Sequence, residues 1–257
     1  MPDGGLAIDL RGVGKVFETE SNRVVALAGV DLQIRQGEFV SVIGPSGCGK
    51  TSLMRIVGDL EVPTSGQGTV IGMPPPQARQ AREVGVVFQS PALLDWRTVE
   101  ENVALPGEVF NDQTVLDRVL ETIRIVGLEG FERAYPRELS GGMQSRAAIA
   151  RALTYRPAVL LMDEPFGALD EITRERMQLE LLRIWEESRP AVLFITHSIP
   201  EAILLSDRVV VMSPRPGRIV YDLTVDFPRP RGARLRTHPK FVQMEDRLRR
   251  MLERGGD

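Results

Sequence analysis

The segment GPSGCGKT, residues 44–51, constrains the fold more than any other part of the sequence. It fits the pattern G-x-x-x-x-G-K-[ST], follows the apolar run EFVSVIG (38–44) and opens the run TSLMRIVGDL (51–60). A glycine-rich turn between a strand and a helix can point its backbone N–H groups at phosphate oxygens. Average residue usage gives such a match by chance in about one chain of this length in a hundred. The segment therefore predicts a strand, a phosphate-binding loop and a helix, in that order.

Several residues of this loop are expected to bind phosphate or Mg²⁺. Lys50 supplies a positive charge for the β- and γ-phosphates, and the Thr51 hydroxyl can ligate Mg²⁺. The glycines let the backbone approach the phosphates closely. The expected phosphate-binding positions are Gly44, Pro45, Ser46, Gly47, Cys48, Gly49, Lys50, Thr51 and Ser52.

Two carboxylates, Asp163 and Glu164, end the apolar run VLLMDEP (159–165). Buried carboxylates are unfavourable unless they meet a cation or hydrogen bonds. At the carboxyl end of a strand in an open α/β sheet they would border the ligand crevice. Asp163 then suits the Mg²⁺ shell, directly or through water, and Glu164 suits a general base that polarises the attacking water. Strands often end in acids, so this interpretation depends on the phosphate loop.

His197 and Gln89 follow two further predicted strands, 192–196 and 84–88. We expect both side chains at the same crevice, with His197 contacting the γ-phosphate or the attacking water. The Gln89 amide can ligate Mg²⁺ without adding charge. The alternatives are a surface or satisfied core histidine and an ordinary loop glutamine.

Short β-rich runs alternate with helical patterns along the chain. We expect strands at 6–10, 30–34, 38–44, 84–88, 158–164, 192–196 and 208–212. The later runs are nearly all apolar, as expected of central strands covered on both faces. No strand is expected between 98 and 156, where runs such as 113–128 predict helices. The sequence therefore predicts an α/β domain that carries a helical lobe.

The segment ELSGGMQSRAAIARAL (138–153) predicts a helix whose first turn is poorly suited to packing. Ser140 can cap the helix, but Gly141 and Gly142 each destabilise it by about 1 kcal/mol relative to alanine. A capped surface helix explains the serine and leaves the two glycines unexplained. Because bare N–H groups and the positive end of a helix dipole suit an anion, we expect an anion site here.

Composition argues against several classes of protein. A single cysteine, Cys48, rules out an internal disulfide framework. The net charge of −3 gives no whole-molecule case for nucleic-acid binding. No apolar run approaches the roughly 20 residues that a membrane span needs. We expect a soluble cytosolic chain without a nucleic-acid partner. If the chain acts at a membrane, another subunit must hold it there.

Together, and in order along nearly the whole chain, these motifs resemble the ATPase subunit of an ATP-binding cassette (ABC) transporter. The resemblance implies ATP and Mg²⁺ as cofactors and a P-loop ATPase core with a helical signature subdomain. Gln89 corresponds to the Q-loop glutamine, Asp170 to the aspartate of the D-loop GALD (167–170), and His197 to the switch histidine. In the family an aromatic residue stacks on adenine, and Phe17 falls at that place. A small core anchor is the alternative for Phe17.

The resemblance also implies which anion the glycine-rich start of this helix would bind. In this family two cassettes pack head to tail, and each signature helix caps the γ-phosphate held by the other copy. The signature here is LSGGM (139–143), so Ser140, Gly141 and Gly142 are expected to act on a second copy of the chain. Met143 stands where glutamine is commoner, and this departure removes no group assigned to chemistry.

Two further segments are similar to the nitrate, sulfonate and taurine importer group. They are PALLDWRTVEENVALP (91–106) and MSPRPGRIVYDLTVDFPRPR (212–231). The resemblance implies permease subunits as partners, a solute-binding protein acting through them, and a peripheral place on the cytoplasmic face of the membrane. Trp96 lies where family members meet the coupling helices of the permease, with a core position as the alternative. The alternative functions are the ATPase of an exporter or lipoprotein-extraction complex and a soluble non-transport ABC ATPase.

The expected domain division follows from the same resemblance. Residues 1–228 form the ATPase domain, with a nucleotide-binding core at 1–90 and 158–228 and a helical subdomain at 91–157. Residues 229–257 form a basic C-terminal tail helix, in which 229–254 hold nine Arg or Lys against three Asp or Glu. This run could touch acidic lipid or a partner, with a solvated terminal helix as the simpler interpretation.

Overall fold

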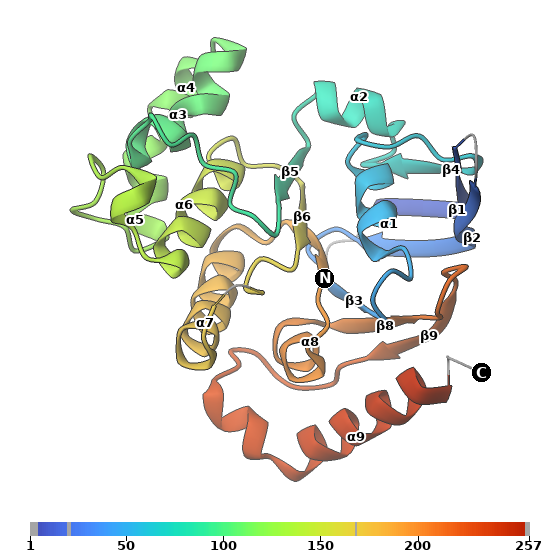
Figure 1. Cartoon of the computed structure of the whole chain (residues 1–257). Coiled ribbons are helices and arrows are strands. Elements are labelled where there is room, and N and C mark those ends of the chain that lie inside the picture. Colours follow the sequence, from blue (N-terminus) through green and yellow to red (C-terminus); the bar gives the residue numbers. More distant parts are fainter. Residues whose placement is uncertain (1–4, 20–21, 168, 255–257) are drawn as a thin grey trace.

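The computed structural model describes residues 5–19, 22–167 and 169–254 and arranges them as two sheets with surrounding helices (Figure 1). The strands are β1 (Leu6–Thr19), β2 (Asn22–Arg35), β3 (Phe39–Ile43), β4 (Ser65–Val70), β5 (Val84–Val87), β6 (Val159–Asp163), β7 (Ala191–Ile195), β8 (Arg208–Met212) and β9 (Ile219–Thr224). The α-helices are α1 (Lys50–Val57), α2 (Pro75–Gln80), α3 (Val99–Phe110), α4 (Gln113–Leu116), α5 (Val119–Ile125), α6 (Gly141–Leu153), α7 (Glu171–Ser188), α8 (Ile199–Leu205) and α9 (Pro239–Arg254).

The larger sheet has the strand order β5-β6-β7-β3-β8-β9, and the smaller antiparallel sheet has the order β2-β1-β4. All neighbouring pairs of the larger sheet are parallel except β8 and β9. The carboxyl ends of β5, β6, β7 and β3 therefore lie at one edge. Because parallel strands need crossover connections, each of these four ends leads into a loop at that edge.

The alternation of side chains along the strands divides the core into two parts. On β3, Phe39 and Ile43 belong to a cluster with residues of α6, α7, α8 and α9. Val40 and Val42 point the other way, into a second cluster with α1, β1, β2 and β4. The strand is buried throughout because both of its faces are covered.

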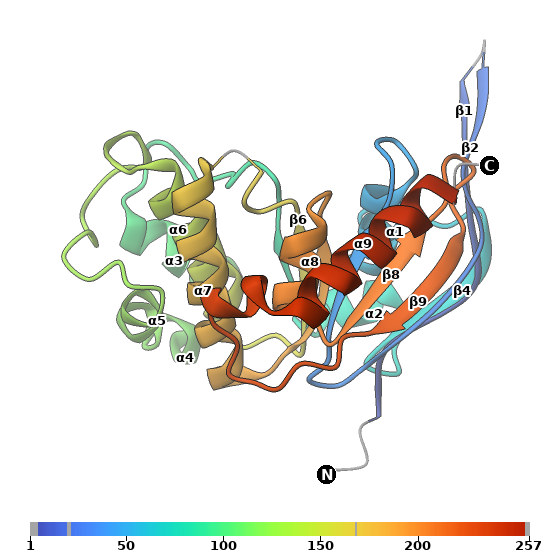
Figure 2. The same cartoon turned by 90° about the horizontal axis from the view of Figure 1, so that it is seen from below.

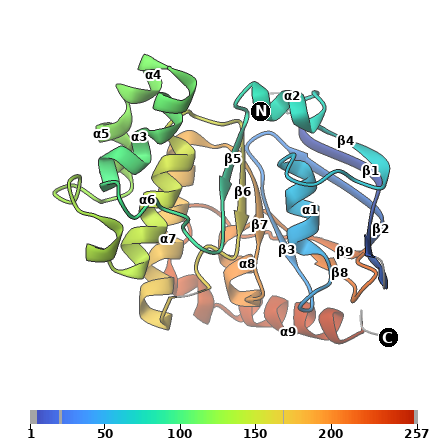
Figure 3. The same cartoon turned by 45° about the horizontal axis from the view of Figure 1, so that its top comes forward.

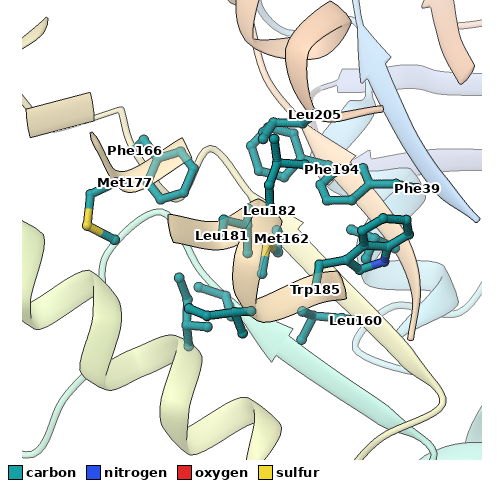
Figure 4. Packing of buried hydrophobic residues seen from close by; sticks show 14 of the residues in the cluster. Phe39, Leu160, Met162, Phe166, Met177, Leu181, Leu182, Trp185, Phe194 and Leu205 are labelled. Carbon is teal, nitrogen blue, oxygen red and sulfur yellow. The ribbon is translucent and has the colours of Figure 1, made fainter. Parts of the chain in front are cut away.

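A group of aromatic side chains packs between the sheet and α7 (Figure 4). The Phe39 ring meets the rings of Trp185 and Phe194, with centroid distances of 5.7 Å in both cases. Trp185 Nε1 donates to the Pro190 carbonyl at 2.9 Å, so the buried indole keeps a hydrogen bond. This packing fixes α7 against the strands that lead to the site.

A strand is present at each expected place, but β1 and β2 extend well beyond the expected 6–10 and 30–34, and two further strands, β4 and β9, were not expected. The sequence SGQGTV of β4 contains two glycines and is largely exposed, and β9 is an edge strand, so neither gives a strong buried signal. In the described part of the chain, 98–156 contains no strand, as expected. The helical run 113–128 divides into α4 and α5. Figure 3 shows α3–α7 on one side of β5 and β6 and α1 on the other.

The C-terminal segment packs against the rest of the molecule. Helix α9 lies along α8 and β8 (Figure 2), and its Phe241 and Leu248 are buried in the core. No helix among the described residues has the length and hydropathy needed to cross a bilayer.

Arg231 fixes the chain leading to α9. Its Nη1 donates to the carbonyl oxygens of Ile203, Leu204 and Ser206 at 3.1, 3.2 and 2.7 Å, and its Nη2 donates to those of Val225 and Phe227. Burial lowers the pKa of Arg231 to about 10, so the side chain remains a cation at neutral pH. The guanidinium satisfies carbonyl groups in and directly after the last turn of α8.

We expect Arg231→Met to lower the free energy of unfolding by about 3 kcal/mol, because it leaves several buried carbonyl groups without a donor. Urea unfolding followed by circular dichroism measures the change. Arg234→Met is the matched control, since Arg234 is exposed and should change stability by less than about 0.5 kcal/mol. Equal effects of the two substitutions would contradict the role given to Arg231.

Candidate active site

The candidate site lies at the edge where β3, β5, β6 and β7 end. The backbone joins these strand ends directly, since Thr196 N donates to Val42 O at 3.3 Å and Glu164 N donates to Ile195 O at 2.9 Å. Residues separated by more than a hundred positions in the sequence are therefore held next to one another. This is the crevice position at which open α/β sheets bind ligands.

The loop between β3 and α1 folds around the Lys50 side chain. Lys50 is 8% exposed, and its Nζ donates to the carbonyl oxygens of Gly44 at 2.8 Å and Pro45 at 3.0 Å. Gly49 has φ 107°, and a Cβ there would lie 2.8 Å from the Ala26 carbonyl of β2. The loop thus requires glycine at this point and encloses a cation, as phosphate binding needs.

Cys48 contributes only its backbone to the loop surface. Its side chain is 1% exposed and belongs to the core cluster on the α1 face of the sheet. A Cβ at Gly44 would lie 2.9 Å from Cys48 Sγ, so the thiol fills the space beneath the loop. Ser46 and Gly47, by contrast, are exposed, and Thr51 and Ser52 are partly buried at the start of α1.

Thr51 and Asp163 form a pair of oxygen donors suited to Mg²⁺. Thr51 Oγ1 donates to Asp163 Oδ1 at 3.3 Å, and Asp163 is 9% exposed. Burial raises the pKa of Asp163, while the Thr51 hydrogen bond and the charges of Arg55 and Lys50 lower it. A buried carboxylate beside a hydroxyl fits a small hard cation, which usually keeps waters and phosphate oxygens as its other ligands. The residues present therefore fit the expected metal.

Glu164 and His197 form the second pair at this edge. His197 Nδ1 lies 3.2 Å from Glu164 Oε2, and the His197 side chain is 62% exposed. Glu164 has φ 44°, which is uncommon for a residue with a side chain. Its backbone is held in this conformation by Ile195 O and by Gly167 N, which donates to Glu164 O at 3.0 Å. The geometry keeps a carboxylate and an imidazole in contact at the opening of the crevice.

Gln89 reaches the same loop from β5. The side chain is exposed, and a Cβ at Gly167 would lie 3.7 Å from Gln89 Nε2. Gln89 therefore lies beside the loop that follows Glu164. The described residues contain no group of three or more His, Cys, Asp or Glu side chains arranged to hold a metal. The expected Mg²⁺ ligands Thr51, Asp163 and Gln89 include only one residue of these four types, Asp163.

The hairpin between β8 and β9 contacts the phosphate loop, which the sequence did not indicate. Arg215 donates through Nε and Nη2 to the Gly47 carbonyl at 3.2 and 3.0 Å. Gly217 exchanges backbone hydrogen bonds with Ala26 and Ala28. These contacts join the hairpin to β2 and to the phosphate loop, which lie far from it in the sequence.

Phe17 lies on β1, opposite Val24 of β2. Its side chain is 38% exposed, and Lys15 Nζ lies 4.9 Å from the ring centroid. An exposed ring on this strand pair is available for stacking, and the position differs from that of a buried core anchor.

The signature residues lie on the other side of β5 and β6 from α1 (Figures 1 and 3). Ser140 caps α6 and accepts a hydrogen bond from Met143 N at 3.3 Å. Gly142 has a packing reason within the chain, because a Cβ there would lie 3.0 Å from Thr173 Cγ2 of α7. Packing against α7 is therefore sufficient to explain buried Gly142, and exposed Gly141 is the better indication of an anion site.

Asp170 caps the start of α7, and its Oδ1 accepts from Thr173 N at 3.0 Å. Hydrogen bonds from Thr173 lower the pKa of this exposed carboxyl. The neighbouring Ala168 of the GALD segment lies outside the described residues. The structure therefore gives Asp170 a capping role near the Glu164 loop.

Residues 27–167 match the ABC transporter family. The aliphatic sulfonates import ATP-binding protein of Bacillus cereus is 42% identical over 251 residues, which cover 98% of each chain. The nitrate import ATP-binding protein of Synechococcus elongatus is 44% identical over 90% of this chain and 86% of the relative. A solved dimer of an ATP-binding cassette, in a post-hydrolysis state with ADP and phosphate, has a TM-score of 0.74 and 32% identity, covering 86% of this chain and 100% of the other.

Proposed function

Because this chain belongs to the ABC transporter family, whose ATPase fold it has, we propose that it powers an importer of small anions such as aliphatic sulfonates or nitrate. Its reaction is the hydrolysis of ATP coupled to transport. One observation carries the proposal: Lys50, the Thr51–Asp163 pair and the Glu164–His197 pair all lie at the same edge of the sheet. The likeness to import subunits over nearly the full length supports the direction of transport.

In the proposed reaction, the N–H groups of the phosphate loop and the Lys50 ammonium bind the β- and γ-phosphates. Thr51 and Asp163, with Gln89 nearby, would hold Mg²⁺, which would supply positive charge to neutralise the phosphates. Glu164 takes a proton from the attacking water as that water approaches the γ-phosphorus. His197 orients the Glu164 carboxylate through the 3.2 Å contact and has exposed ring atoms to offer the γ-phosphate.

We further propose that two copies of the chain pack head to tail around the nucleotides. The solved relative is dimeric, and exposed Ser140 and Gly141 stand at the start of α6, a helix that lies across β5 and β6 from α1 (Figure 3). N–H groups and the dipole at such a helix start favour a phosphate. Asp170, beside the Glu164 loop, would then lie close to the second copy.

The proposed contact with the membrane subunits lies on the helical subdomain, 91–157, and the adjoining core. Trp96 is 74% exposed, which excludes a core position. A cavity of about 270 Å³ next to the helical lobe is lined by apolar residues, including Leu60, Val86, Phe88 and Pro106, and by Arg79 and Arg151. An exposed Trp and a largely apolar groove are both features that suit a short helix of another protein. We place the subunit on the cytoplasmic face, with the solute-binding protein acting through the permease.

The test replaces the ATP-binding subunit of a bacterial sulfonate importer, and separately of a nitrate importer, with this chain. Growth on the corresponding sulfur or nitrogen source is expected to return in at least one strain. Trp96→Ala should lower uptake about tenfold by weakening docking, while the ATPase rate of the isolated chain stays within twofold.

Val242→Ala is the matched control, since Val242 is an exposed apolar residue on α9, and uptake should be unchanged. An unchanged uptake rate in Trp96→Ala would contradict the docking site. Failure of the unaltered chain in both strains would contradict the importer assignment.

A further inference from the structure

Glu201 is a buried carboxylate that has no part in the proposed reaction. It is 4% exposed in the first turn of α8, four residues after His197. Gln178 Nε2 donates to Glu201 Oε1 at 2.8 Å, and the Thr196 hydroxyl donates to Glu201 Oε2. Gln178 and Thr196 are themselves buried, at 1% and 2% exposure. An ionisable group buried in this way calls for an explanation.

The network continues from Gln178 to the C-terminal segment. Arg236, in the short 3₁₀ turn Ala233–Thr237, donates through Nη2 to Gln178 Oε1 and through Nη1 to Glu175 Oε1 at 2.8 Å. Because Arg236 occupies the amide oxygen of Gln178, the amide nitrogen must face Glu201. Both partners of Arg236 are on α7, so the arginine joins the tail, α7 and α8.

The other end of the network holds the residues on both sides of His197. Thr196 binds Glu201 through its hydroxyl, and the same oxygen accepts from Ser198 N at 3.0 Å. Ser198 caps α8, where its Oγ accepts from Glu201 N at 3.4 Å. The His197 ring contacts Glu164 through Nδ1, 3.2 Å from Oε2. Its position therefore depends on the backbone that Thr196 and Ser198 fix.

We propose that Glu201 is a positioning residue for His197, and that Arg236 of the C-terminal segment sets its position through Gln178. The inference rests on the proposed roles of Glu164 and His197. It makes the tail part of the hydrolytic apparatus, because loosening Arg236 frees the Gln178 amide and, through Glu201, the Thr196–Ser198 backbone.

The electrostatics of the buried network agree with this arrangement. Burial raises the pKa of Glu201, whereas its hydrogen bonds from Thr196 and Gln178 and the charges of Arg174 and His197 lower it. Arg174 and His197 line the same small hollow as Glu164 and Glu201. Both hydrogen-bond partners of the carboxylate are therefore needed to keep it in one place.

The test compares Arg236→Met with Arg234→Met in the full chain. Arg236→Met should lower kcat for ATP about tenfold while KM changes less than twofold, because the phosphate loop is untouched and the reacting groups are misplaced. Arg236→Lys should recover much of the loss, since its ammonium can still reach the Gln178 oxygen. Arg234 is an exposed arginine of the same turn, and Arg234→Met should leave kcat and KM unchanged.

A second readout separates positioning from general destabilisation. The chain has two histidines, so the ring signals of His197 can be assigned in an NMR spectrum by their loss in His197→Ala. Arg236→Met should shift or broaden these signals, and Arg234→Met should not. An unchanged kcat, or a fall in kcat with unmoved His197 signals, would overturn the inference. Absence of ATP hydrolysis by the unaltered chain would instead count against the proposed function.

Discussion

Glu164→Gln is expected to lower the rate of ATP hydrolysis at least about a hundredfold while ATP still binds. The amide keeps the size and polarity of the carboxylate but cannot take a proton from water. Because the ATP bound between the two copies is no longer hydrolysed, MgATP should hold two copies of the variant together. Phosphate release measures the rate, and size-exclusion chromatography with and without MgATP measures the dimer.

Glu187→Gln is the matched control for this substitution, since Glu187 is a surface carboxylate on α7 paired with Arg183. The control should hydrolyse ATP at the rate of the unaltered chain and show no persistent dimer. Near-normal turnover of Glu164→Gln would remove Glu164 from the role of general base.

A mixture of Lys50→Ala and Ser140→Arg chains is expected to hydrolyse ATP, although each variant alone should be inactive. Lys50→Ala removes the cation of the phosphate loop, and Ser140→Arg blocks the helix start that would face the second copy's nucleotide. In a head-to-tail pair with one copy of each variant, one site combines an intact Lys50 with an intact Ser140. Random pairing places such a site in about half of the dimers, and the phosphate-release rate of the mixture should rise accordingly.

The double variant, Lys50→Ala with Ser140→Arg, controls for non-specific rescue. Mixed with either single variant it leaves no site with both residues intact, so no activity should return. A mixture of the two single variants that stays inactive would mean that each signature serves its own phosphate loop. That result would contradict the head-to-tail arrangement.

Local sequence was sufficient for the parts of the site that one strand and its following turn create. EFVSVIG followed by GPSGCGKT, and VLLMDEP, each place their polar residues at the end of a buried strand, and β3 and β6 confirm these strands. The signal is strong because burial on both faces requires continuous apolar residues, and the polar residues mark where burial stops. The signature helix was also predicted, and α6 begins directly after Ser140.

Local sequence was insufficient where a residue has two uses. Gly142 was interpreted through its effect on an isolated helix, but the structure brings α7 so close that a Cβ there would lie 3.0 Å from Thr173 Cγ2. Cys48 lies in the phosphate-binding motif, yet its thiol packs into the core. The strands β4 and β9 lack the buried apolar run by which the other strands were predicted.

The sequence by itself determined the phosphate loop, the Asp163–Glu164 strand end, the principal strands of the α/β core and the family to which the chain belongs. Each of these depends on neighbouring residues, whose spacing the backbone geometry of a strand, turn or helix fixes directly. Only the tertiary structure decided that Glu164 meets His197, that Arg215 binds the Gly47 carbonyl, and that Arg236 reaches Gln178. These contacts join segments far apart in the chain, and the order of strands in the sheet and the packing of α7, α8 and the tail bring them together.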